Sequence, residues 1–121
     1  MLPTEVGVVG FGGQGIHAGG SGAVPAFGDN VRLAGGTSKW LWEGEPRKFE
    51  PPPDLIIYNQ GANDGEAGTK SVYSPLFIEV VKGLMAAVPT ARQLLLLPFN
   101  AEQHRADILR VVSAAQRARP T

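Results

Sequence analysis

The sequence predicts an α/β domain built around a mainly parallel sheet. Two short apolar runs, residues 54–60 (DLIIYNQ) and 92–99 (RQLLLLPF), indicate buried strands. Each run is followed by a segment in which apolar residues recur at helical spacing. Strands that alternate with helices in this way are typical of a parallel sheet, because a helix makes the crossover between neighbouring strands. The 121 residues are enough for one such domain.

A further strand is expected near the N-terminus, where Val6, Val8 and Val9 precede Gly10. Residues 10–53 then form a long segment rich in Gly and Pro, with no apolar period long enough to predict a helix. A loop of that length in a compact domain is unusual and is often functional. The expected order is strand, long loop, strand, helix, strand, helix.

Both helices have recognisable ends. From Pro75 onward the apolar residues recur at helical spacing, with Ser74 as the expected N-cap, and Pro89 ends the pattern. The second amphipathic helix is expected over residues 101–117, with Asn100 as its N-cap.

The composition excludes several classes of function. Lys plus Arg and Asp plus Glu both number 11, so no basic face is indicated and nucleic acid is not an expected partner. The chain has no Cys, which excludes disulfides, zinc–thiolate sites and a Cys nucleophile. Two His and scattered carboxylates show no metal-ligand spacing, so neither a metal nor another cofactor is expected. The longest apolar run, residues 94–97, is too short for a membrane span.

The loop from Gly10 to Gly15 satisfies G-x-G-x-x-G, the dinucleotide-binding fingerprint. That fingerprint needs a helix that opens at the third glycine, but the residues that follow Gly15 include more Gly and a Pro. Each interior Gly costs a helix about 1 kcal/mol and a Pro about 3 kcal/mol. Asp29, the acidic residue at roughly the required distance, does not end a strand. Dinucleotide binding therefore stays an alternative, beside a plain turn and a loop whose backbone N–H groups face a site.

The turn Gly61-Ala62-Asn63-Asp64 follows the first predicted buried strand. In open parallel sheets ligands bind outside the carboxyl ends of strands, so this turn and the glycine loop are the candidate site. A strand followed by G-x-N-D resembles the third conserved block of the SGNH hydrolases, or GDSL esterases. The lead-in FEPPPD and the stretch NQGANDG resemble in particular the carbohydrate acetylesterase-type members. The resemblance extends over roughly residues 5–110.

The resemblance implies a three-layer, flavodoxin-like parallel sheet and a serine-dependent acyl or acetyl esterase. Its substrate would be a small-molecule or carbohydrate ester. The oxyanion hole would combine the Asn63 side chain with the backbone N–H of Gly13, or alternatively of Gly12, and Asp64 would support the turn. Such donors suit acyl transfer, which passes through a tetrahedral oxyanion. The residues expected to bind substrate are Gly12, Gln14 and Gly61. The turn is also explained by the turn-forming tendency of Asn and Asp alone, which leaves the paired glycine loop unexplained.

Two blocks of the family are missing from the sequence. The family's nucleophile is a Ser in a Gly-Asp-Ser motif before the glycine loop, and its base is a His in an Asp-x-x-His motif near the C-terminus. Here Gly28-Asp29 is followed by Asn30 and comes after the loop. Ser21 lies in GGSGA, which lacks the last glycine of a nucleophile elbow and the strand before it.

The two histidines, His17 and His104, are expected to be exposed or structural. His104 forms His-x-x-Asp with Asp107, the reverse of the family order. We therefore expect residues 1–121 to be a single partial SGNH domain, incomplete at both ends. It would carry the oxyanion hole but no nucleophile or base, and would be inactive alone. The alternative is a non-catalytic binding module, either a dinucleotide binder or a pseudo-esterase.

Aromatic residues are concentrated in the long irregular segment. Phe27, Trp40, Trp42 and Phe49 either line a substrate subsite or pin the loop to the sheet, and pinning is the simpler expectation.

Overall fold

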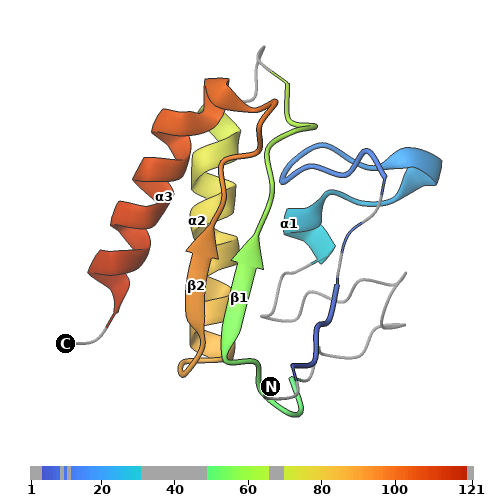
Figure 1. The fold of residues 1–121 in the computed structure, drawn as a ribbon. Helices are drawn as coiled ribbons and strands as arrows, with labels where there is room; N and C mark the ends of the chain where they lie inside the picture. The colour runs from blue at the N-terminus through green and yellow to red at the C-terminus, as the bar shows by residue number, and fades with distance from the viewer. Residues whose placement is uncertain (1–3, 9, 11, 31–48, 66–69, 120–121) are drawn as a thin grey trace.

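The computed structural model describes residues 4–8, 10, 12–30, 49–65 and 70–119. Two parallel strands and two long helices form its centre, as expected for an α/β domain (Figure 1). The elements are η1 (Ser21–Ala23), α1 (Phe27–Asn30), β1 (Leu55–Tyr58), α2 (Lys70–Ala87), β2 (Arg92–Leu95), η2 (Glu102–His104) and α3 (Arg105–Ala118).

The strands β1 and β2 pair in parallel, with Leu55 opposite Arg92 and Tyr58 opposite Leu95. The pairing extends past the strand ends, because the Leu96 N–H donates to the Tyr58 carbonyl at 2.8 Å. Helix α2 makes the crossover between the strands, and α3 packs beside α2 (Figure 1). Both strands predicted from the apolar runs are confirmed, and so is their parallel direction.

The core lies between one face of the sheet and the two helices. Tyr58 from β1 meets Phe77 from α2 edge to face, with ring centroids 5.7 Å apart. Phe77 in turn meets Tyr73 at 5.6 Å. Aromatic pairs in this geometry add to the stabilisation that comes from burial. The cluster of buried residues consists of Ile16, Phe27, Tyr58, Tyr73, Phe77, Val80, Val81, Leu84, Ile108 and Val111.

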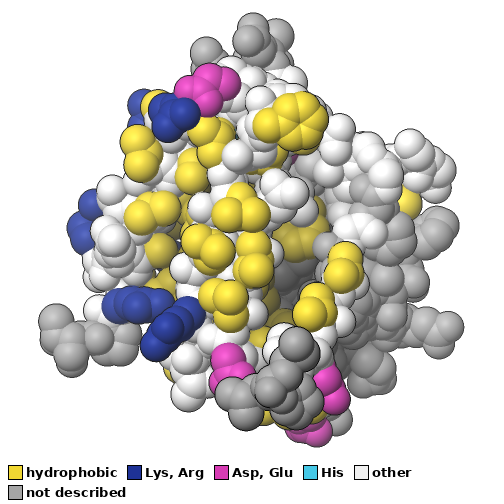
Figure 2. Space-filling view, in the orientation of Figure 1, with side chains coloured by type: hydrophobic (Ala, Val, Ile, Leu, Met, Phe, Trp, Pro, Cys, Tyr) yellow, Lys and Arg dark blue, Asp and Glu magenta, His cyan; other side chains and the backbone are white. Residues whose placement is uncertain are grey.

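The opposite face of the sheet is apolar but exposed. Leu55 and Ile57 are 47% and 55% exposed, and Leu94 and Leu96 are exposed beside them. These side chains contribute to the hydrophobic surface in Figure 2. The strands were predicted to be buried, and this holds for one face only. Within the described residues, no helix lies over the second face.

The predicted N-terminal strand is wrong. Residues 4–8 and 10 form no strand, and Val6 and Val8 are 79% and 88% exposed. A strand needs a hydrogen-bonded neighbour, and within the described residues only β1 and β2 pair with each other. β-Branched residues favour extended backbone but do not supply that neighbour.

Helix α2 begins earlier than predicted, at Lys70, so that Pro75 lies inside it and Ser74 is not its N-cap. The Ser74 side chain is buried and donates to Asp107 Oδ1 at 2.6 Å. Pro75 is the sixth residue of α2, so the helix lacks the hydrogen bond that its N–H would donate to the carbonyl four residues earlier. The helix ends at Ala87, close to the predicted stop at Pro89.

The start of α3 also differs from the prediction. A 3₁₀ turn, η2, precedes it, and the residue at the N-cap of η2 is Ala101 rather than Asn100. No side chain caps either element. Neither α2 nor any other helix in the described ranges is long and apolar enough to cross a membrane.

Residues 12–30 are mostly irregular, as expected, apart from the short elements η1 and α1. Phe27 is buried in the main core and Phe49 packs against it, as expected for residues that pin the loop. Trp40 and Trp42 lie outside the described residues.

Candidate functional site

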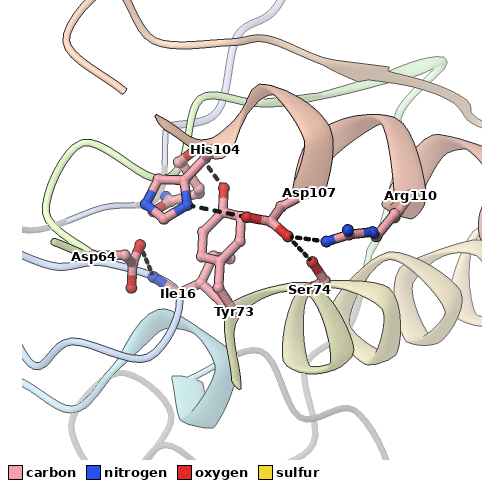
Figure 3. Close-up of polar contacts among 8 residues, drawn as sticks. Ile16, Asp64, Tyr73, Ser74, His104, Asp107 and Arg110 are labelled. Carbon is pink, nitrogen blue, oxygen red and sulfur yellow. Dashed lines mark hydrogen bonds and ion pairs between the residues drawn. The ribbon is translucent and has the colours of Figure 1, made fainter. Parts of the chain in front are cut away.

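The glycine loop and the G-x-N-D turn meet at Asp64. Its Oδ2 accepts the Ile16 N–H at 2.8 Å, and its Oδ1 accepts those of His17 at 2.9 Å and Ala18 at 3.2 Å. These partners lie 46–48 residues away in the chain. Figure 3 shows the carboxylate beside Ile16. The structure thus joins two of the segments that the sequence singled out.

Asp64 is only 1% exposed, so its charge has to be compensated inside the protein. Successive backbone N–H groups form a concave anion site, and here the anion is a side chain of the same chain. Asp64 was expected to hold the Asn63 turn through backbone N–H groups. The backbone groups that its carboxylate binds instead belong to the glycine loop.

Asn63 is bonded to the residue after Gly13, because Asn63 Nδ2 donates to the Gln14 carbonyl at 3.1 Å. Asn63 is exposed, and this bond uses one of its two amide hydrogens. Gly13 is exposed as well, with a φ of 75° that favours glycine. Within the described part of the chain, the Gly13 N–H has no acceptor. One amide hydrogen and one backbone N–H are therefore available at this end of the sheet.

The three residues expected to bind substrate lie in different environments. Gln14 is 5% exposed, and its Nε2 donates to the Pro25 carbonyl at 2.8 Å. Gly12 is exposed, and its carbonyl accepts the Ser21 N–H at 3.0 Å. Gly61 is buried and lies against Tyr73. Of these three residues, only Gly12 is thus exposed.

Gly15 has a structural role that the sequence did not reveal. A Cβ at this position would lie 2.5 Å from Asp64 Oδ1, closer than any real Cβ contact. The absence of a side chain is what lets the carboxylate reach the loop. The glycine-rich spacing predicts that another group comes close to the backbone of the loop. The structure shows that this group is the Asp64 carboxylate of the Gly61–Asp64 turn.

Neither histidine has the surroundings of a catalytic base for Ser21. Ser21 is exposed, and its Oγ lies 3.3 Å from the place a Cβ on Gly13 would occupy. His17 is half-buried, and its ring Nε2 has no hydrogen-bond partner among the described residues. His104 is fully buried, so it is not exposed.

A buried polar cluster that sequence reasoning missed surrounds His104 (Figure 3). His104 Nδ1 lies 3.6 Å from Asp107 Oδ2, too far for a hydrogen bond. Asp107 Oδ1 also accepts bonds from Ser74 at 2.6 Å and from Arg110 at 2.7 Å. The i, i+3 spacing of His104 and Asp107 was visible in the sequence, but the partner on α2 was not.

The surroundings shift two pKa values in this cluster. Burial would raise the pKa of Asp107, but the Ser74 hydroxyl, His104 and the Arg110 guanidinium together hold it below its usual value. Burial, with the negative charges of Asp64 and Asp107, raises the pKa of Tyr73. The Tyr73 hydroxyl therefore stays protonated and donates to the Gln60 carbonyl at 3.0 Å.

The structure does not provide the helix that a dinucleotide site needs at Gly15. Residues 16–20 form bends and irregular backbone, and the next elements, η1 and α1, have three and four residues. The N–H groups of residues 16–18 already bind Asp64. A pyrophosphate would compete with that carboxylate.

Among the described residues, no group of three or more His, Cys, Asp or Glu side chains is arranged to hold a metal ion. Comparison with protein-family models, with curated proteins and with solved structures found no match to this chain. The arguments for function therefore come from the site itself and from the resemblance of its motifs.

Proposed function

We propose that this chain is the oxyanion-binding part of a serine-dependent ester hydrolase of the SGNH type, acting on a small acyl or acetyl ester. Gly13 and Asn63 are the proposed oxyanion donors, and Asp64 supports both. The nucleophile and the base are not in this chain.

The observation that carries the proposal is the bond set of Asp64. One carboxylate ties the N–H groups of residues 16–18, directly after the glycine loop, to the turn that bears Asn63. A plain turn at residues 61–65 does not require a partner 46–48 residues away. A site that needs donors from two segments far apart in the chain does require one, because preorganised donors stabilise the oxyanion without rearrangement.

The chemistry fits the two proposed donors. Asn63 offers an uncharged N–H, and Gly13 lets the backbone approach a substrate without a Cβ. Loss of one such donor typically costs about 3 kcal/mol in the transition state.

The three-layer, flavodoxin-like sheet remains part of this proposal. The parallel β1–α2–β2 unit is the repeating unit of such sheets. The exposed apolar face at Leu55, Ile57 and Leu94 is the face that a third layer would cover.

A titration with a tetrahedral anion tests the oxyanion site without a nucleophile. Methylphosphonate is added to the ¹⁵N-labelled chain, and amide signals are followed by NMR. The Gly13 N–H and the Asn63 side-chain amide should shift together, with millimolar affinity. Asn63→Ala should abolish the Gly13 shift, while Asn59→Ala, at an exposed position after β1, should leave it intact. Shifts confined to other residues would contradict the proposal.

Hydrolysis of 4-nitrophenyl acetate tests the missing nucleophile. The chain by itself should show no rate above the buffer background, and Ser21→Ala and His17→Ala should change nothing. A measurable rate that Ser21→Ala abolishes would place the nucleophile in this chain. Reading the coding DNA on both sides of codons 1–121 for Gly-Asp-Ser and Asp-x-x-His motifs completes this test.

A pseudo-esterase, which binds the ester and does not cleave it, is the second candidate. It is favoured by the fact that no Ser–His hydrogen bond occurs among the described residues. Methylphosphonate binding, together with flanking DNA that lacks both motifs, would select it over the esterase.

A further inference from the structure

We propose that Tyr73 and His104 are positioning residues for the Gly61–Asp64 turn, and that α3 sets the position of the Asn63 amide through them. The proposal rests on the proposed function only in assuming that the turn presents Asn63 as an oxyanion donor. The contacts themselves do not depend on that function. The contacts that carry it are made at the buried residue Gly61, whereas Asn63 of the same turn is exposed.

The rings of Tyr73 and His104 pack directly against the backbone of the turn. Gly61 has a φ of 127°, and a Cβ there would lie 2.8 Å from the Tyr73 hydroxyl and 3.5 Å from His104 Cδ2. The Tyr73 hydroxyl also donates to the carbonyl of Gln60 at 3.0 Å. The backbone just before Asn63 is thus in contact with one ring and bonded to its hydroxyl.

The two rings form a rigid stack. Tyr73 and His104 have centroids 4.2 Å apart and planes 21° apart, and both are fully buried. Phe77 supports the edge of Tyr73. A planar stack held on several sides leaves little freedom to its members. The stack therefore couples the position of the Tyr73 ring to that of His104.

His104 is in turn held at the start of α3. Asp107, one helical turn further on, lies 3.6 Å from His104 Nδ1 and is bonded to Ser74 of α2. Figure 3 shows His104 between Asp107 and Asp64. A continuous set of contacts thus runs from the α2–α3 interface to the turn that carries Asn63.

A role for His104 as the catalytic base is incompatible with this geometry. The side chain is fully buried and one face of the ring is covered by Tyr73. A base has to come within hydrogen-bond reach of the proton that it removes. Positioning requires no such access.

The test compares His104→Ala with His104→Phe in the ¹⁵N-labelled chain, with no ligand present. The alanine variant removes the stack, so the side-chain amide signals of Asn63 should shift or broaden. Phenylalanine keeps a flat ring in place and should restore the wild-type signals. Tyr73→Phe, which removes only the bond to Gln60, should give a smaller shift. The control is Leu109→Ala, at a 61% exposed position on α3 outside the ring stack, which should leave the Asn63 signals unchanged.

Asn63 signals that stay at their wild-type positions in His104→Ala would overturn the proposal. If that variant does not fold, nuclear Overhauser effects decide in the wild-type chain: contacts between the Tyr73 ring and the Gly61 Hα support the proposal, and their absence overturns it. Failure of methylphosphonate binding, with the Asn63 shifts of His104→Ala intact, would reject the esterase function and leave the positioning role standing.

Discussion

Residues 49–119 and residues 12–30 are held in the structure by different forces. The first region has a strand pair, two packed helices and most of the buried core. The second has no strand and only two short helical elements. It is attached through the Asp64 bonds, the Asn63–Gln14 bond, and the burial of Ile16 and Phe27.

This difference implies unequal local stability. Apolar packing is spread over many residues, so the loss of one contact is shared among the others. Three of the hydrogen bonds that attach residues 12–30 converge on one carboxylate, so a substitution of Asp64 should weaken this attachment while the helices and strands remain. The candidate site, which needs both regions, would be lost well before the fold.

The largest effect is expected in the first region. Phe77→Ala should lower the free energy of unfolding by about 3–5 kcal/mol, because it leaves a cavity between two aromatic rings. Denaturant titration followed by circular dichroism measures the loss. Leu109→Ala, at a 61% exposed position on α3, is the control and should cost less than about 1 kcal/mol. Equal costs at both positions would contradict the core described here.

The next effect separates the two regions directly. Asp64→Asn should lower the free energy that holds residues 16–18 against the turn by about 2–3 kcal/mol. The reason is that the N–H groups of Ile16 and His17 lose a carboxylate acceptor. Hydrogen exchange should become fast at residues 16–18 and stay slow in α2 and β2. Asp54→Asn, at an exposed carboxylate, is the matched control. Fast exchange throughout the chain would show that the regions unfold as one unit.

The acid dependence of stability tests the cluster inside the first region. The pKa of Asp107 is lowered from 3.8, so its contribution is present above that value and is lost as the pH falls through the folded pKa. Asp107→Asn should cost about 1–3 kcal/mol at pH 7 and progressively less below about pH 4. Denaturant titrations at several pH values measure the difference, and a difference independent of pH would contradict this origin.

The smallest effect compares two glycines of the same loop. Gly15→Ala should cost about 1–3 kcal/mol, because its Cβ would collide with the Asp64 carboxylate. At Gly12 no atom of the described residues beyond its chain neighbours lies within 4 Å of an added Cβ, so Gly12→Ala should be close to neutral. Exchange rates at residues 16–18 report both. Equal rates in the two variants would show that the contact between loop and carboxylate is looser than described.

Prediction from sequence succeeded where short-range patterns decide the structure. The β1 and β2 runs, the body of α2 and the turn after β1 all follow from apolar spacing and from Gly, Asn and Pro at their ends. The Val6–Val9 strand failed because its pattern carries no information about a partner strand. The N-cap predicted at Ser74 was wrong because α2 begins four residues earlier, at Lys70, and the Ser74 hydroxyl donates to Asp107 instead.

The sequence by itself determined the α/β class, the parallel strand pair and the two segments that form the candidate site. The tertiary structure alone decided that Asp64 binds the glycine loop, that Gly15 has to lack a side chain, and that His104 and Tyr73 lie behind Gly61. The physical reason is the range of the interactions. Periodicity and turn propensity act over a few residues, whereas the bonds of Asp64 join groups that are 46–48 residues apart and meet only after the sheet and helices have packed.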